Sequence, residues 1–374
     1  MRYTSLLQTC YSYAMKVRPV LFALLFAAFL IFTPPMLLAD GVDTYCYDCL
    51  TSFEQLAYDA IKDCLTHLIP SWNCGSIPQE TIQKAYDCFL MDHPEVFWTD
   101  GYTYVTSYVN NSISGRRVEF TYNMDKTAIA EANNDIYQSL LAIVLETGSI
   151  SASYETVKAI YDYMVRNCTY DELNLDQSMY SVMVDKSGVC ASFAKAFEFI
   201  MQCLEIPCTV VYGRLTQSSG MLSTTIGHEW NIVQLDGKWY HVDITSGLAI
   251  SADQGYPDYR FLCTTTEEIC RTHIIENPVP VPDCSSNDLE FFHLHGMTVD
   301  TYSRQNVAQA MLNGIENGTG PICRFSSYRA FTEAIDDLFT HSGIFQAIKD
   351  YTDFTVSTID YSIDEQMLTI RLDV

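Results

Sequence analysis

Three side chains of this sequence have the types and spacing of a nucleophile, a general base and an orienting acid: Cys190, His228 and Asp243. Cys190 stands at the start of a predicted amphipathic helix, where unpaired backbone N–H groups and the positive end of the helix dipole favour a thiolate. Thiolate is the reactive form of cysteine, so this position suits a nucleophile. Free cysteines are also among the most buried residue types, and a structural thiol is the alternative.

The predicted base and acid lie on a β-hairpin. Segments 228–235 and 238–244 have the pattern of strands, joined by a two-residue Asp-Gly turn at 236–237. In this register His228 and Asp243 are diagonal neighbours on one face, within hydrogen-bond reach. The carboxylate would hold one imidazole nitrogen and leave the other to face a thiol. A slip of one residue would put the two side chains on opposite faces.

Apolar periodicity predicts a mixture of helices and strands around these residues. The N-terminal part is predicted to be helical over 43–90, with strands at 96–98, 103–109 and 117–122 and helices at 126–145 and 154–166. The helix that begins at Cys190 should be followed by a strand at 209–215 and, from the Ser, Thr and Gly content, by a mobile loop at 217–227. The C-terminal part is predicted to contain a helix at 307–312, a strand at 322–325, two helices, and a hairpin at 354–359 and 367–372.

Composition excludes one class of partner. The chain has 374 residues, is 48% hydrophobic and carries 46 acidic against 21 basic residues, a formal net charge of −25. This content of apolar residues is typical of a globular protein. The negative field would repel a phosphate backbone, and no basic run offers a local patch, so we expect no nucleic-acid binding.

The N-terminal residues 1–39 have the pattern of an export signal or a membrane anchor. Basic residues precede an apolar run at 20–32, and the small residue Ala39 follows it. If the segment is not cleaved, residues 20–39 could span a membrane, which would be the only membrane contact. The predicted location is therefore secreted or cell-surface. The 14 cysteines favour disulfides or free buried thiols over a metal site.

Several motifs together resemble the core of transglutaminase-like proteins. They are Gly188-Val189-Cys190-Ala191-Ser192-Phe193, Ile206-Pro207-Cys208, Gly227-His228-Glu229-Trp230-Asn231 and Asp236-Gly237-Lys238-Trp239-Tyr240-His241-Val242-Asp243. A weaker resemblance extends over 54–296 and includes Asp92-His93-Pro94 and the stretch 272–283. One departure follows Asp243, where the chain has Ile244-Thr245-Ser246-Gly247 in place of the tryptophan and acidic residues frequent in relatives.

The resemblance implies an α+β fold with a papain-like core. In that core, a helix bearing the nucleophile packs on an antiparallel sheet that presents the base and the acid. The implied organisation is a signal peptide or anchor at 1–39, an N-terminal helical and strand region at 40–150, a transglutaminase-like catalytic core at 151–300 and a small α/β extension at 301–374.

By the same resemblance, Cys190 is the nucleophile, His228 the general base and Asp243 the orienting carboxylate. Gln177 resembles a recurrent glutamine that could donate to an oxyanion, although capping of its loop is an equal alternative. His241 lies on the same predicted face, one step nearer the turn, and is the weaker candidate base.

The implied chemistry is acyl transfer or hydrolysis on protein or peptide amides through a thioester, with no metal or cofactor required. The alternatives are a cysteine peptidase or deamidase, and a catalytically lapsed module that binds peptides or cell-surface polymers.

Overall fold

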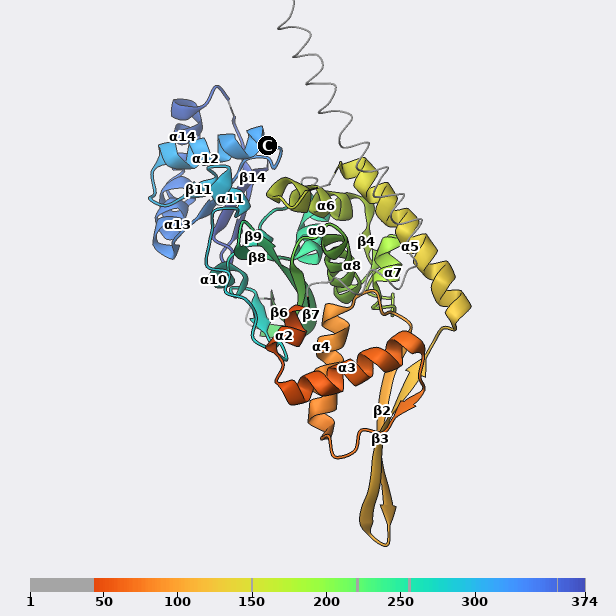
Figure 1. Ribbon diagram of the computed structural model, residues 1–374. Coiled ribbons are helices and arrows are strands. Elements are labelled where there is room, and N and C mark those ends of the chain that lie inside the picture. Colours follow the sequence, from red (N-terminus) through yellow and green to blue (C-terminus); the bar gives the residue numbers. More distant parts are fainter. Residues whose placement is uncertain (1–43, 149–150, 220–221, 255–256, 355, 374) are drawn as a thin grey trace, which may run out of the picture. The chain divides into compact units, whose positions relative to one another are not determined.

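The computed structural model describes residues 44–148, 151–219, 222–254, 257–354 and 356–373 (Figure 1). The predicted export segment at 1–39 lies outside these ranges. Within them, no helix combines the length and apolar character needed to cross a membrane. Contacts divide the chain into two compact units. The first holds residues up to Val211 with 234–236 and 277–281, and the second holds 212–233, 237–276 and 282–374.

The first unit is mainly helical. Its helices are α2 (Tyr45–Cys49), α3 (Ser52–His67), α4 (Gln79–Asp92), α5 (Lys126–Thr147), α6 (Tyr154–Asn167), α7 (Met179–Met183) and α8 (Cys190–Cys203). Side-chain caps explain where several of them begin. Thr51 and Glu54 form a capping box at α3, Asp125 caps α5 and Ser153 caps α6. The predicted helices at 126–145 and 154–166 are confirmed, and the helical stretch over 43–90 is three separate helices.

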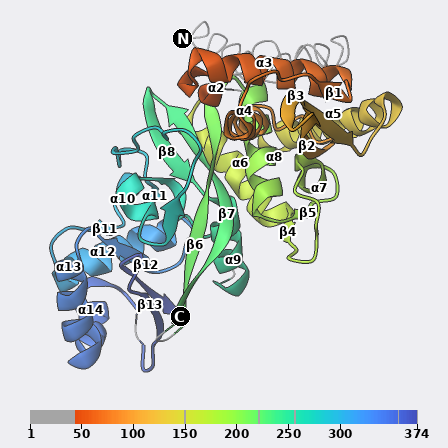
Figure 2. The ribbon, with the colours of Figure 1, turned by 90° about the horizontal axis from the view of Figure 1, so that it is seen from below.

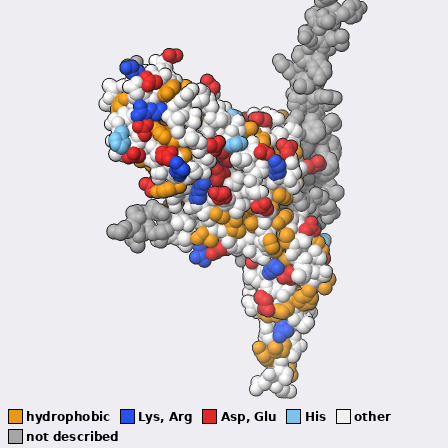
Figure 3. Space-filling view, turned by 90° about the vertical axis from the view of Figure 1, so that its left-hand side faces the viewer, with side chains coloured by type: hydrophobic (Ala, Val, Ile, Leu, Met, Phe, Trp, Pro, Cys, Tyr) orange, Lys and Arg blue, Asp and Glu red, His pale blue; other side chains and the backbone are white. Residues whose placement is uncertain are grey.

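A long hairpin extends the first unit. It comprises β2 (Thr99–Val109) and β3 (Ser112–Tyr122), with the short β1 (Ser71–Trp72) paired to β3. Apolar side chains are visible on its surface in Figure 3, and Tyr108, Val109 and Ile113 are each at least half exposed. The predicted strand at 96–98 is wrong. These residues form a buried connection, in which the indole N–H of Trp98 donates to the Leu65 carbonyl at 2.9 Å.

The second unit contains a five-stranded sheet in the order β10-β6-β7-β8-β9, of which Figure 2 labels β6, β7 and β8. Its strands are β6 (Cys208–Ser219, which begins in the first unit), β7 (Leu222–Leu235), β8 (Lys238–Val242), β9 (Leu262–Thr264) and β10 (His273–Ile275). Strands β10 and β6 are antiparallel, as are β8 and β9. The predicted α+β class, with antiparallel sheets, is confirmed.

Two predictions around this sheet are corrected. Residues 217–219 and 222–227, predicted as a loop, are in strands, because β6 runs to Ser219 and β7 begins at Leu222. Threonine is β-branched and favours extended backbone, so a Thr-rich stretch suits a strand as well as a loop. The second strand of the predicted hairpin ends at Val242 instead of 244, and Ile244 begins an unpredicted helix, α9 (Ile244–Gln254).

The rest of the second unit surrounds a four-stranded sheet in the order β11-β12-β14-β13. The elements are α10 (Thr266–Ile269), α11 (Phe291–Leu294), β11 (Thr298–Val299), α12 (Arg304–Glu316), β12 (Ile322–Phe325), α13 (Tyr328–Ile335), the π-helix η2 (Asp336–Thr340), α14 (Gly343–Tyr351), β13 (Asp360–Asp364) and β14 (Thr369–Asp373). The predicted strand at 322–325 is confirmed. The closing hairpin was predicted to begin with a strand at 354–359. Its first strand is instead β13, at Asp360–Asp364.

Candidate active site

Cys190 is the first residue of α8 and is partly exposed. The preceding chain is fixed by a short parallel pair, β4 (Thr169–Tyr170) with β5 (Ser187–Gly188). No side chain caps α8 at Val189, so no capping side chain occupies the N–H groups of its first turn. The hydroxyl of Tyr170 contacts Cys190, and burial, followed by the charge of this thiol, raises the pKa of Tyr170 to about 12. The predicted helix start is confirmed.

Gly188, two residues before α8, lies in close contact with side chains of α7 and α8. A Cβ at this position would lie 2.9 Å from Ser181 Oγ, from Ser192 Cβ and from Val182 Cγ2. Ser192 is fully buried, and its hydroxyl donates to the Asp176 carbonyl at 2.8 Å. A side chain at Gly188 would therefore push α8 away from α7.

We predict that Gly188→Ala lowers the free energy of unfolding by about 1–3 kcal/mol, because it overpacks a tight site. Urea unfolding measures the change. Gly115→Ala is the matched control, since a Cβ there would meet no atom within 4 Å. Equal effects from the two substitutions would contradict the role assigned to Gly188.

The hairpin places His228 against Asp243. Asp236 and Gly237 both have positive φ angles, 51° and 75°, which is the two-residue turn that was predicted. His228 Nε2 lies 2.8 Å from Asp243 Oδ2, and both side chains are almost fully buried. The contact that the predicted register required between these two side chains is thus present. With Nε2 on the carboxylate, the other ring nitrogen, Nδ1, is the one that could take a proton from a thiol.

The Asp243 carboxylate receives donors on both oxygens. Oδ2 is also 2.9 Å from His273 Nε2, while Oδ1 accepts from the Thr245 hydroxyl at 2.9 Å and from the Ser246 N–H at 3.1 Å. Burial raises the pKa of Asp243, but the charge and hydrogen bond of His228, followed by those of His273, lower it well below its ordinary value. Asp243 therefore stays ionised and can support positive charge on His228.

His241 is unsuited to the role of base. Its Nδ1 accepts from the Trp230 indole N–H at 3.0 Å, and its Nε2 lies 3.1 Å from Thr266 Oγ1. An indole nitrogen only donates, so the acceptor nitrogen of His241 is already used. Burial, and then the charge of His273, lower the pKa of His241 to about 3.

His273 was missed in the sequence. It lies on β10, two strands from β7 in the sheet, and its ring packs edge-to-face against Trp230. Gly213 on β6 makes room for this arrangement, because a Cβ there would come within 2.8 Å of the Trp230 ring. His273 lies in the stretch 272–283 that the weaker resemblance includes, but no role was predicted for it, because only the order of the strands brings it to Asp243.

His228, Asp243 and His273 also form a group with metal-ligand geometry. Their ligand atoms lie within 4.8 Å of one another, and no second such group of His, Cys, Asp or Glu occurs among the described residues. Both Nε2 atoms point at one carboxylate oxygen at hydrogen-bond distance. Each Nε2 therefore donates a proton there, which leaves it no lone pair for a metal. All described cysteines are free thiols.

Gln177 lies in the first unit with Cys190, just before α7, and is exposed. Its backbone carbonyl accepts from Lys195 at 3.1 Å. The loop is capped by its neighbour, because Asp176 Oδ1 accepts the Ser178 N–H at 2.8 Å. Capping of the loop is thus done by Asp176, and an oxyanion role for Gln177 stays a prediction.

Comparison with known proteins agrees with the motifs. Residues 142–244 match the model of the transglutaminase-like superfamily. No curated protein matches this chain. Solved structures with a similar arrangement include a TGase, with 16% identity over 39% of this chain and 44% of that one (TM-score 0.27).

Two other similar structures are of bacterial origin. One is the periplasmic domain of TgpA from Pseudomonas aeruginosa bound to ethylmercury, with 17% identity over 36% of this chain and 56% of that one (TM-score 0.24). The other, from Cytophaga hutchinsonii and provisionally described as a cysteine protease, has 15% identity over 39% and 62% (TM-score 0.25). This chain spans about half of the length of the structures it matches. The resemblance inferred from the motifs is confirmed for residues 142–244, which carry the core sequence of the transglutaminase-like superfamily.

Proposed function

We propose that this protein is a thiol-dependent enzyme that transfers or hydrolyses acyl groups of protein or peptide amides. Cys190 would be the nucleophile, His228 the general base and Asp243 the orienting acid. The observation that carries the proposal is the 2.8 Å contact between His228 and Asp243, in a segment that matches the transglutaminase-like superfamily. The start of α8 at Cys190 supports the choice of nucleophile.

In the proposed mechanism, His228 Nδ1 takes the proton from the thiol of Cys190. The thiolate adds to the amide carbonyl, and the C–N bond breaks as His228 returns the proton to the leaving amine or ammonia. The product of this half-reaction is a thioester. An amine or a water molecule then attacks the thioester, again losing its proton to His228, and the thiol is released. Asp243 holds the imidazole and balances its positive charge.

Gln177 is the proposed side-chain donor to the oxyanion. A Gln177→Ala variant should then lower kcat by about 10²-fold with little change in KM, because an oxyanion donor acts mainly in the transition state. An unchanged kcat would leave the N–H groups at the start of α8 as the oxyanion donors.

The proposed substrates are proteins or peptides, and cell-surface polymers are a second candidate class. The proposed location of the protein is outside the cytoplasm. The net charge of −25 and the N-terminal pattern support export. Sequencing the N-terminus of the mature protein tests it: a new N-terminus near residue 40 supports a cleaved signal, and an intact membrane-bound chain supports an anchor.

Mass spectrometry of a glutamine peptide, incubated with and without a primary amine, distinguishes the reactions. An amine adduct identifies a transglutaminase, and a gain of about one mass unit without amine identifies a deamidase. A cleaved backbone identifies a peptidase. An unchanged peptide that nevertheless binds would favour the lapsed binding module.

His273 should act as a positioning residue under this proposal. His273→Leu is expected to lower kcat/KM by about tenfold, since leucine cannot donate and one hydrogen bond to a charged group is lost. Asp243 would then hold the proton on His228 more tightly, so the acid limb of the pH–rate profile should move to higher pH. His293→Leu, at an exposed position, is the control. A loss of activity without any movement of the acid limb would indicate a purely structural role.

A further inference from the structure

The first unit contains an apolar pocket that involves neither Cys190 nor the histidines of the hairpin. Its volume is about 310 Å³. Side chains from α3, α5 and the end of α8 line it, together with the segment after α4, which includes His93, Glu95 and Trp98. The pocket is at the small end of the range for sites that take drug-sized ligands.

Two acceptors in this pocket have no partner among the described residues. His93 ends α4 and is 1% exposed, and its ring packs against Phe89 with the centroids 4.6 Å apart. Its Nδ1 lies 2.8 Å from Glu95 Oε1. The other atoms of this pair, His93 Nε2 and Glu95 Oε2, are buried without a hydrogen bond. Buried polar groups are nearly always satisfied, so two such atoms in one cavity indicate an absent partner.

The chemistry of the pair defines that partner. A carboxylate only accepts, so the contact with Glu95 places a proton of His93 on Nδ1, and in the neutral imidazole Nε2 is then an acceptor. The pair therefore presents two acceptors, one of them a carboxylate oxygen. The pocket is also lined by Lys62, Thr66, His67, Lys126, Asn133 and Tyr137. Two further polar groups of the lining are engaged elsewhere. The Trp98 indole N–H donates to the Leu65 carbonyl, and the Gln202 amide donates to the Asp92 carbonyl.

We propose that this pocket binds an apolar molecule that ends in a hydrogen-bond donor, an amine or an alcohol. The donor group pairs with Glu95 and His93, and the apolar body fills the space between α3, α5 and α8. Two residues of the Asp92-His93-Pro94 motif then have different roles. Asp92 anchors α2 through the N–H groups of Cys46 and Tyr47, at 2.8 and 2.9 Å, and His93 serves the ligand.

Titration with three molecules of equal length tests the proposal: hexylamine, hexan-1-ol and hexanoate. Tryptophan fluorescence reports binding because Trp98 lines the pocket. No acyl donor is present, so the result does not depend on Cys190. Saturable binding of the amine or the alcohol, with hexanoate about tenfold weaker or more, is expected because a carboxylate would face Glu95.

Glu95→Gln is expected to weaken hexylamine binding by about tenfold and hexan-1-ol binding by less, because the ammonium loses a charged partner. A larger effect on the amine than on the alcohol identifies ammonium as the preferred donor, and comparable effects identify a hydroxyl. Glu131→Gln, exposed on α5, is the matched control and should leave both affinities unchanged. Equal affinities for the three head groups, no saturable binding, or identical effects of the two glutamine substitutions would overturn the proposal.

Discussion

Replacing Cys190 by alanine is expected to lower kcat/KM on a peptide amide by about 10⁴-fold or more, because the covalent route through the thioester is lost. The peptide assay with mass detection measures the change. His228→Ala should have a similar effect, since a thiol without its base is a poor nucleophile at neutral pH. The double variant should be little worse than either single variant, because the two groups act as one unit.

Thiol alkylation separates this assignment from a structural role for Cys190. With limiting iodoacetamide near neutral pH, Cys190 should be labelled first, and its labelling should slow in His228→Ala. Cys270 is the matched control because it is exposed and therefore accessible to the reagent. Labelling of Cys190 at the rate of Cys270, or independent of His228, would contradict the proposed nucleophile.

Local signals in the sequence were sufficient to predict the hairpin that carries His228. The Asp236-Gly237 turn fixes a two-residue connection, and the period of two along each strand then determines which side chains share a face. The contact between His228 and Asp243 follows from those two facts. The start of α8 at Cys190 could also be predicted from the sequence, because an amphipathic pattern begins there.

The remaining features of the site depend on contacts distant in sequence. His273 reaches Asp243 only because β10 pairs with β6, which in turn pairs with β7. Helix α9 starts at Ile244, where strand-like residues continue, and its first turn supplies the Thr245 and Ser246 donors to Asp243. The β-propensity of these residues alone would extend β8 beyond Val242. The hydrogen bonds that α9 gives to the buried Asp243 carboxylate outweigh that preference.

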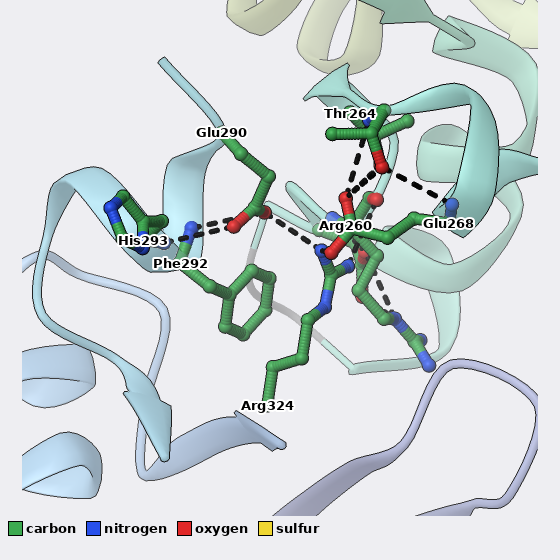
Figure 4. Close-up of polar contacts among 9 residues, drawn as sticks. Arg260, Thr264, Glu268, Glu290, Phe292, His293 and Arg324 are labelled. Carbon is green, nitrogen blue, oxygen red and sulfur yellow. Dashed lines mark hydrogen bonds and ion pairs between the residues drawn. The ribbon is translucent and has the colours of Figure 1, made fainter. Parts of the chain in front are cut away.

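A second large effect is expected in the second unit, where Arg324 on β12 is 1% exposed. Its guanidinium lies between two carboxylates (Figure 4). Nη1 is 2.8 Å from Glu290 Oε1 and 3.4 Å from Glu268 Oε1, and Nη2 donates to the Arg260 carbonyl at 3.0 Å. Arg324→Met should lower the free energy of unfolding by about 3–5 kcal/mol, because it leaves Glu290 charged, buried and without its cation.

The pH dependence of this loss has a definite sign. Burial raises the pKa of Glu290 even though Arg324 opposes the rise, and without Arg324 the pKa should rise further. A carboxyl group with a raised folded pKa stabilises the fold when protonated, and that contribution is lost as pH rises through the folded value. The deficit of Arg324→Met should therefore be larger at about pH 8 than at about pH 5, as measured by urea unfolding at each pH.

Two comparisons show whether the buried charge is the cause. Arg324→Met with Glu290→Gln should be more stable than Arg324→Met alone, because glutamine removes the buried charge and still offers one acceptor to the Phe292 and His293 N–H groups at the start of α11. Arg329→Met, at an exposed pair with Glu333, should change stability by less than about 0.5 kcal/mol. If the double variant were no more stable than Arg324→Met, the loss would come from the packing of Arg324 over the Phe292 ring, 4.4 Å away, and not from the unpaired carboxylate.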